Sequence, residues 1–289
     1  MEISPIIDKT RQDKTRQATS CSESPDIKII IACHKKCNVP SDTVYFPVHV
    51  GAEGKEPIGF TPDNTGDNIS TQNNMISELT GLYWAWKNLS CGYIGLVHYS
   101  RYLAMHPKFG TSSVNDALTG EQIRHMLTAN KIILPRRRKY YIETLYSHYA
   151  HTADGSHLDT AREVISLKCP EYLKSFDEVM GRTWGHIFNM FIMSRPLADE
   201  YCEWLFPILF ELEERIDMSN KSVFDSRRIG SVAEHMIDVW LGRQLETGRI
   251  SAHDIHEVPY IYTRRINWFR KAGGFLAAKF FHRKYTKSF

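Results

Sequence analysis

The chain has 289 residues, of which 42% are apolar and 24% are charged, and its formal net charge is +3. These values are typical of a soluble globular protein with a sizeable core, and they argue against a membrane-spanning or nucleic-acid-binding chain. The six cysteines follow neither a metal-binding nor a disulfide-framework spacing, and no signal peptide begins the chain, so we expect free thiols in a cytoplasmic protein.

Residues 1–26 are polar and contain the pentapeptide DKTRQ twice in tandem. A segment with so few apolar side chains cannot offset the conformational entropy that it would lose on ordering. The sequence therefore predicts a disordered N-terminal tail.

The folded domain is predicted to span residues 27–262, because strand and helix patterns alternate along it. The β-branched run "IKIIIAC" at 27–33 is typical of a strand that is buried on both faces. This alternation predicts a single α/β domain, with a mixed, mostly parallel sheet flanked by helices. In chain order we expect strands at 27–33 and 44–50, a helix at about 76–89, a strand at 93–99, a helix beginning near Thr119, strands at 131–135 and 186–194, and helices at about 196–216, kinked at Pro207, and about 229–243.

The segment 263–289 is rich in lysine, arginine and aromatic residues and has no acidic residue. Cationic side chains beside aromatic ones suit an anionic membrane surface, so we expect this segment to form a membrane-surface helix. The alternative is a helix packed on the domain with a solvated basic face. RNA binding is a weaker third interpretation, because no RNA-binding motif accompanies the charge.

The common catalytic signatures are missing from the sequence. It has no phosphate-binding Gly-Lys-Ser/Thr loop, dinucleotide fingerprint or Gly-x-Ser-x-Gly motif, and no Asp-x-Asp pair to hold a metal. The pairs His148/His151 and His253/His256 are three residues apart, but such pairs are more often hydrogen-bonded or surface histidines than metal ligands. No metal site is predicted.

Polar side chains gather instead at the predicted ends of two strands, where α/β proteins usually bind ligands. His34 and Lys35 follow the first strand, and His98, Tyr99 and Arg101 stand at the end of the strand that begins at 93. Lys35, His98 and Arg101 can donate to a diphosphate, and Tyr99 can stack on a base or a sugar.

Four further residues complete the candidate nucleotide-sugar site. Asp63, Asp67 and Asn68 lie in the loop before the first helix, and Asn189 interrupts the apolar stretch "IFNMFIM". Each also has a structural interpretation, because Asp and Asn build turns through their own side chains. A buried Asn can likewise satisfy backbone groups.

Six motifs in order resemble the bacterial capsular and exopolysaccharide biosynthesis glycosyltransferases: "DNTGDNIS", "ELTGLYWAWKN", "YIGLVHYSRYL", "YYIETLYSHYAHT", "FNMFIM" and "YCEWLFPILFELEERID". The resemblance covers residues 27 to about 245. It implies a GT-A-like fold and transfer of a sugar from a nucleotide-diphospho-sugar. UDP is the first candidate for the nucleotide, and galactofuranose is one candidate for the sugar. The implied acceptor is a glycan or lipid-linked glycan in capsule, O-antigen or exopolysaccharide synthesis.

Where ordinary GT-A enzymes carry their acidic metal-binding pair, this family has His-Tyr-x-Arg, which the chain keeps as His98, Tyr99 and Arg101. We therefore expect cationic side chains to stabilise the leaving diphosphate without a required cofactor. A divalent cation such as Mn²⁺ is the alternative. The chain departs from the family at Ser100 and His235, where members often have arginine, so no role is assigned to either residue.

A base is needed to accept the proton of the acceptor hydroxyl, and the candidates are Glu234 and Asp159. Glu234 can instead be a buried structural carboxylate paired with Arg228, and Asp159 a helix cap. Asp63 and Asp67 would contact sugar or ribose hydroxyls. The competing function is a non-catalytic scaffold or sugar-nucleotide-binding subunit of a polysaccharide assembly complex. In either case we expect a cytoplasmic protein, peripheral on the inner face of the membrane.

Overall fold

The computed structural model describes residues 26–107, 112–216 and 228–264. The predicted tail, apart from Asp26, and the basic segment, apart from Thr263 and Arg264, lie outside these residues.

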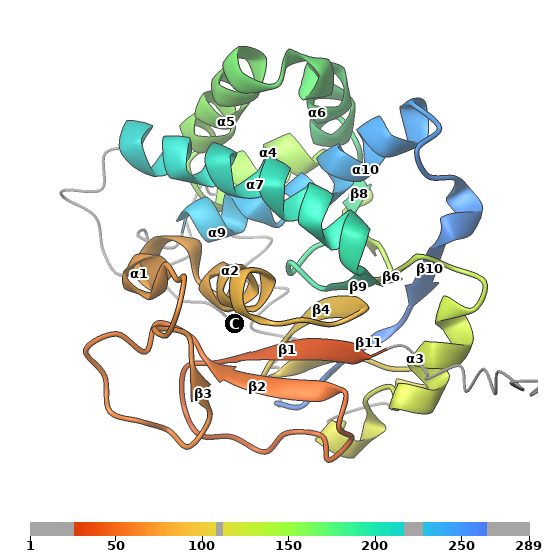
Figure 1. The fold of residues 1–289 in the computed structure, drawn as a ribbon. Helices are drawn as coiled ribbons and strands as arrows, with labels where there is room; N and C mark the ends of the chain where they lie inside the picture. The colour runs from red at the N-terminus through yellow and green to blue at the C-terminus, as the bar shows by residue number, and fades with distance from the viewer. Residues whose placement is uncertain (1–25, 108–111, 217–227, 265–289) are drawn as a thin grey trace, which may run out of the picture.

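A nine-stranded sheet runs through the centre of the molecule (Figure 1), with β10-β6-β9-β4-β1-β2-β3 as its main order and β5 bridging β4 to β11. Along this path β9 runs antiparallel to β4 and β6, while the other paired neighbours are parallel. The strands are β1 (Ile27–Cys33), β2 (Tyr45–His49), β3 (Thr61–Pro62), β4 (Tyr93–His98), β5 (Arg101–Leu103), β6 (Ile132–Pro135), β9 (Phe191–Ser194), β10 (Ile255–Val258) and β11 (Tyr260–Tyr262), with β7 (Arg138–Lys139) and β8 (Trp184–Gly185) in a separate ribbon. The predicted mixed, mostly parallel sheet is confirmed.

Helices cover the sheet on one side in a thick layer, which Figure 1 shows above it, and α3 lies on the other side. The helices are α1 (Asn73–Ile76), α2 (Leu79–Asn88), α3 (Gly120–Leu127), α4 (Leu145–Thr152), α5 (Ser156–Lys168), α6 (Leu173–Met180), α7 (Arg195–Arg215), α9 (Arg228–Ala233) and α10 (Met236–Glu246), with short 3₁₀ turns at Ser70–Gln72, Val114–Asp116, Pro170–Tyr172 and Ala252–Asp254. Within the described ranges, no helix is long and apolar enough to span a bilayer.

The side chains of the central strands pack into two separate cores, one on each face of the sheet. Both faces of β1 are therefore buried, and every residue of the strand except Lys28 is apolar. Ile30 and Leu96 pack into the larger core under α2, α5, α7 and α10. Ile29 and Ile31 face the smaller core with α3. Burial on both faces is what a continuous β-branched run predicts.

Three expected elements are interrupted, and each interruption falls at the carboxyl end of the sheet. The helix expected at 76–89 is split into α1 and α2 at Ser77, which adopts a φ of +53°. The helix expected at 229–243 is split into α9 and α10 at Glu234 and His235. The strand expected at 186–194 begins only at Phe191, because Phe188 and Asn189 have positive φ angles.

Candidate functional site

Five polar side chains converge beyond the carboxyl end of β4, and we call them the central cluster: Glu78, His98, Arg101, Asn189 and Glu234. His98 is the last residue of β4, and a two-residue turn brings the chain back as β5, so that His98 and Arg101 pair across the strands. Glu78 immediately precedes α2, and Glu234 stands in the break between α9 and α10. Four separate segments therefore supply one site at the sheet edge where open α/β sheets bind ligands.

Glu78 is the carboxylate around which the cluster is organised. Its Oε1 accepts a hydrogen bond of 2.7 Å from Nδ2 of Asn189 and lies 3.3 Å from Nε2 of His98. Burial opposes ionisation of Glu78, but the attraction of His98 and the amide of Asn189 outweigh it and lower its pKa to about 2. Glu78 is therefore a largely buried anion that fixes the positions of His98 and Asn189.

Sequence reasoning missed Glu78, although a signal was present in "ELTGLYWAWKN". Counting from Glu78, Leu82 and Ala85 stand at positions +4 and +7 and are fully buried. An acidic residue on the buried face of an apolar helix needs a partner, and such a partner marks a site.

The turn at Phe188 and Asn189 is strained and ties the cluster together. The two residues have φ angles of +81° and +53°, which non-glycine residues adopt at a cost. The N–H of Phe188 donates to Oε2 of Glu234 at 3.3 Å, while Asn189 donates to Glu78. Oδ1 of Asn189 is buried without a hydrogen-bond partner among the described residues. A strained turn with an unused buried acceptor is consistent with a ligand site.

Arg101 is held by aromatic rings. Its guanidinium carbon lies 4.3 Å from the ring centre of Phe188 and 5.7 Å from that of Tyr262. Its Nε is buried and has no hydrogen-bond partner among the described residues. Stacking fixes the plane of the guanidinium without consuming its N–H groups, so they can bind an anionic ligand.

Glu234 has the properties of a proton acceptor. It is partly exposed, and its pKa is raised by burial and by the negative charge of Glu78, against the opposing effect of Arg101 and His98. A carboxyl group that binds a proton more tightly than usual, beside a cationic group, is the arrangement used in acid–base catalysis. The neighbouring His235 is buried, and burial lowers its pKa to about 4, so it is neutral near pH 7.

A second group surrounds Tyr99, and we call it the Tyr99 group: His34, Lys35, Tyr99 and Arg264. The rings of His34 and Tyr99 meet edge to face with centres 4.8 Å apart. The cationic groups of Lys35 and Arg264 lie 5.9 and 4.7 Å from the centre of the Tyr99 ring. His34 and Lys35 are exposed. Sequence reasoning placed Arg264 in the basic segment rather than in the site, because it stands 165 positions after Tyr99 in the chain.

Of the loop residues predicted to bind sugar, Asp63 and Asn68 form hydrogen bonds within the segment 51–70, whereas Asp67 bonds to helix α2. Asp63 is fully buried, and its carboxylate accepts from the N–H groups of Gly51 (2.8 Å) and Ala52 (3.0 Å) and from the hydroxyl of Ser70. Asp67 accepts from the hydroxyl of Tyr83, and Asn68 bonds to the backbone of Gly66 and Ser70. Asp63 and Asn68 thus make the turn-building contacts that stood as their alternative, whereas a sugar-binding role for exposed Asp67 stays a prediction.

Asp159 is not brought to the central cluster. It lies on the exposed first turn of α5, where its carboxylate accepts from the hydroxyl of Tyr146 at 3.0 Å. An acidic residue at this position interacts favourably with the helix dipole. Of the two candidate bases, Glu234 alone is described beside Arg101 and Glu78.

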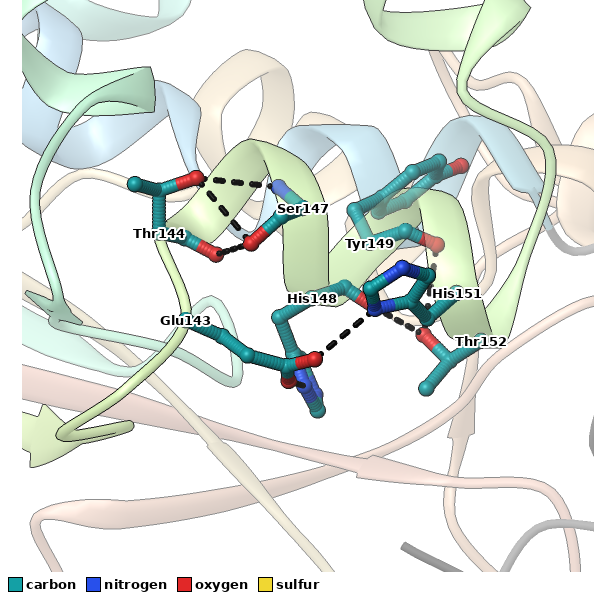
Figure 2. Close-up of polar contacts among 7 residues, drawn as sticks. All are labelled: Glu143, Thr144, Ser147, His148, Tyr149, His151 and Thr152. Atoms are coloured by element: carbon teal, nitrogen blue, oxygen red, sulfur yellow. Dashed lines mark hydrogen bonds and ion pairs between the residues drawn. The ribbon is translucent and has the colours of Figure 1, made fainter. Parts of the chain in front are cut away.

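His148 and His151 have a carboxylate partner that their spacing did not indicate. Nδ1 of His148 lies 3.0 Å from one oxygen of buried Glu143, and Nδ1 of His151 lies 2.8 Å from the other (Figure 2). Burial raises the pKa of Glu143, but the two imidazoles outweigh this and lower it. Glu143 therefore joins the loop before α4 to the helix itself. No three His, Cys, Asp or Glu side chains form a metal-binding group in the described part of the chain.

The fold and this geometry define an α/β protein with a candidate ligand site at the carboxyl edge of its sheet, lined by cationic, aromatic and carboxylate side chains. Residues 28–245 match the family described as "Domain of unknown function (DUF4422)". Because the match covers most of the chain, the chain belongs to that family. A comparison with curated proteins finds no match.

The structure is similar to that of the bifunctional glycosyltransferase WbbM in its apo form, with a TM-score of 0.75 and 26% sequence identity. The alignment covers 83% of this chain and 46% of the WbbM chain, so this chain spans about half the length of that protein. The predicted glycosyltransferase-like fold is thereby confirmed.

Proposed function

We propose that the protein is a glycosyltransferase that moves a sugar from a nucleotide-diphospho-sugar to a glycan or lipid-linked glycan. The observation that carries the proposal is the convergence of Arg101, His98 and Glu234 at the sheet edge of a fold shared with a glycosyltransferase. The likeness to WbbM supports the reaction class. UDP as the nucleotide, galactofuranose as the sugar, and capsule, O-antigen or exopolysaccharide as the product follow from the sequence resemblance.

The donor's diphosphate would lie between the central cluster and the Tyr99 group. Charge develops on the diphosphate as the bond from its oxygen to the anomeric carbon breaks. Arg101 has stacked, oriented N–H groups to meet that charge, and His98, Lys35 and Arg264 add donors around it. The ring of Tyr99 offers a surface for the base or the sugar.

The acceptor hydroxyl attacks the anomeric carbon, and its proton passes to Glu234. The new carbon–oxygen bond forms as the nucleoside diphosphate leaves. The raised pKa of Glu234 supports this assignment over Asp159, because it favours uptake of the proton. We propose that the cationic side chains make a metal ion unnecessary, and that the protein works in the cytoplasm at the inner face of the membrane.

The first test is thermal unfolding of the full chain with a panel of UDP-, GDP-, CMP- and dTDP-sugars, with and without Mn²⁺. One donor class should raise the melting temperature, and Arg101→Ala should abolish that rise. If no nucleotide-sugar stabilises the protein, the proposal is wrong. Stabilisation without release of a nucleoside diphosphate in the presence of acceptor glycans would favour the non-catalytic scaffold.

A further inference from the structure

The loop of residues 136–142, which contains β7 and which we call the β7 loop, ends in two exposed apolar side chains. Tyr141 is 80% exposed and the adjacent Ile142 is 69% exposed. Single exposed apolar residues are ordinary on a soluble protein, but two large neighbouring ones at the tip of a loop indicate a contact surface.

The fold holds this tip outward. Tyr141 has a φ of +59°, and the N–H of Ile142 donates to the carbonyl of Tyr140 at 2.7 Å, which makes a γ-turn of the strained kind. Tyr140 is buried, and its N–H donates to the carbonyl of Thr183 at 2.7 Å. On the other side, Glu143 is clamped by the two histidines of α4 (Figure 2). The residues on both sides of the tip, Tyr140 and Glu143, are therefore held in place by contacts with other segments.

Basic side chains flank the apolar tip. Arg136, Arg137 and Lys139 are exposed, and Arg138 is partly exposed. Arg182 on the adjoining segment is also partly exposed and stacks on Trp184, with its guanidinium 4.9 Å from the ring centre.

Two carboxylates near the loop already have partners, and one of these partners, Arg137, belongs to the loop itself. Glu257 is bound by Arg137 and lies 3.3 Å from His186, which also pairs with buried Asp238. Glu143 is bound by the histidines of α4. The surface around Tyr141 consequently presents a net positive charge.

The β7 loop adjoins the candidate site. The guanidinium of Arg138 lies 4.9 Å from the ring centre of Tyr140, and the ring of Tyr140 lies 4.2 Å from that of His148. The charges of Arg138 and Arg101 both act on Tyr262, which contacts Arg101. Whatever binds the loop is thus placed near the central cluster.

We propose that the β7 loop is a membrane-contact element whose partner is an anionic lipid bilayer. Tyr141 and Ile142 enter the interface between headgroups and acyl chains, and the flanking arginines and lysine meet the phosphate groups. A bilayer fits better than a soluble glycan, because an exposed aliphatic side chain beside several exposed cations has no counterpart in a neutral sugar. The inference rests on the proposed function in one respect: a membrane contact near the site would bring it to a lipid-linked acceptor.

The test is sedimentation of the full chain with sucrose-loaded vesicles of phosphatidylcholine, with and without phosphatidylglycerol. The variants are Tyr141→Ser with Ile142→Ser, and Arg136→Glu with Lys139→Glu. Leu167→Ser is the matched control, since Leu167 is also 69% exposed but lies on α5. Thermal unfolding of each variant confirms that it is folded.

The wild-type chain should bind the anionic vesicles and lose binding at high salt. Each loop variant should lower the partition coefficient by about tenfold or more, and the control should leave it unchanged. The proposal is overturned if the wild type does not bind, or if folded loop variants bind like the wild type, which would place the contact elsewhere, for example in 263–289. It is also overturned if the loop variants keep vesicle binding but lose turnover of a soluble acceptor, which would make the loop a glycan platform. Vesicle binding needs no donor, so its failure is distinguishable from failure of the transferase assignment.

Discussion

Replacing His186 with glutamine removes a buried imidazole that joins the segment after β8 to α10 and β10. Nδ1 of His186 lies 2.6 Å from Oδ1 of Asp238, and Nε2 lies 3.3 Å from Oε1 of Glu257. Burial disfavours the charged ring, but these two carboxylates outweigh it and raise the pKa of His186 to about 9 from its usual 6.5. The folded state therefore binds this proton more tightly than the unfolded state does.

The size and pH window of the effect follow from that shift. The pKa of His186 rises by about 2.5 between the unfolded and the folded state, which corresponds to about 3 kcal/mol at 1.36 kcal/mol per pH unit. Because the folded pKa is raised, this stabilisation is fully present below pH 6.5 and is lost as the pH rises through about 9. His186→Gln should lack it throughout that window.

Urea unfolding at half-unit steps from pH 6 to 9.5 measures the free energy of unfolding of both chains. The wild-type value should fall by about 3 kcal/mol more than that of His186→Gln across the window. Thiol and phenol groups titrate equally in both chains, so the difference between the curves isolates His186. Parallel curves would refute the reasoning.

Three further predictions concern the carboxylates. Glu78→Gln removes the anion that holds His98 and Asn189. Because the pKa of Glu78 is lowered from 4.5 to about 2, the variant should lose about 3 kcal/mol of unfolding free energy at pH 7, and donor turnover should fall. A folded variant with normal stability and turnover would contradict this. Asp63→Ala leaves three buried hydrogen-bond donors unpaired and should lower the free energy of unfolding in urea by about 3 kcal/mol or more. Affinity for the nucleotide-sugar should be unchanged at temperatures where the variant is folded. A selective loss of that affinity would restore the sugar-binding role. Glu234→Gln should lower turnover by about 10²–10⁴-fold and Asp159→Asn by less than about twofold, and the reverse result would reassign the base.

The layout of the sheet was largely predictable, because β1 and β4 are continuous apolar runs and the intervening segments have helical periodicity. The breaks at Ser77 and at Phe188 to Asn189 were not. Periodicity reports which face of an element is buried, but these backbone conformations are stabilised by contacts from other segments. The hydrogen bond between Asn189 and Glu78, for example, joins residues 111 positions apart.

The candidate site likewise has one part that the sequence predicts and one part that it does not. His34, Lys35, His98, Tyr99 and Arg101 lie together because strand ends in a parallel sheet share an edge, which a sequence pattern can reveal. The polar loop did not separate ligand-binding from turn-building residues, since Asp and Asn do both. Its carboxylate Asp63 proves to be a loop anchor, whereas the carboxylate that organises the cluster, Glu78, stands at the start of an apolar helix.

The central claim is that Arg101 and its neighbours, without a metal ion, support the departure of a nucleoside diphosphate. The direct measurement is release of nucleoside diphosphate from the stabilising donor in the presence of acceptor glycan and EDTA, by the wild type and by Arg101→Ala. The account predicts wild-type turnover in EDTA, and a loss on the order of 10²–10³-fold in a variant that melts at the wild-type temperature. Abolition of wild-type turnover by EDTA with recovery in Mn²⁺, or undiminished turnover by Arg101→Ala, would contradict it.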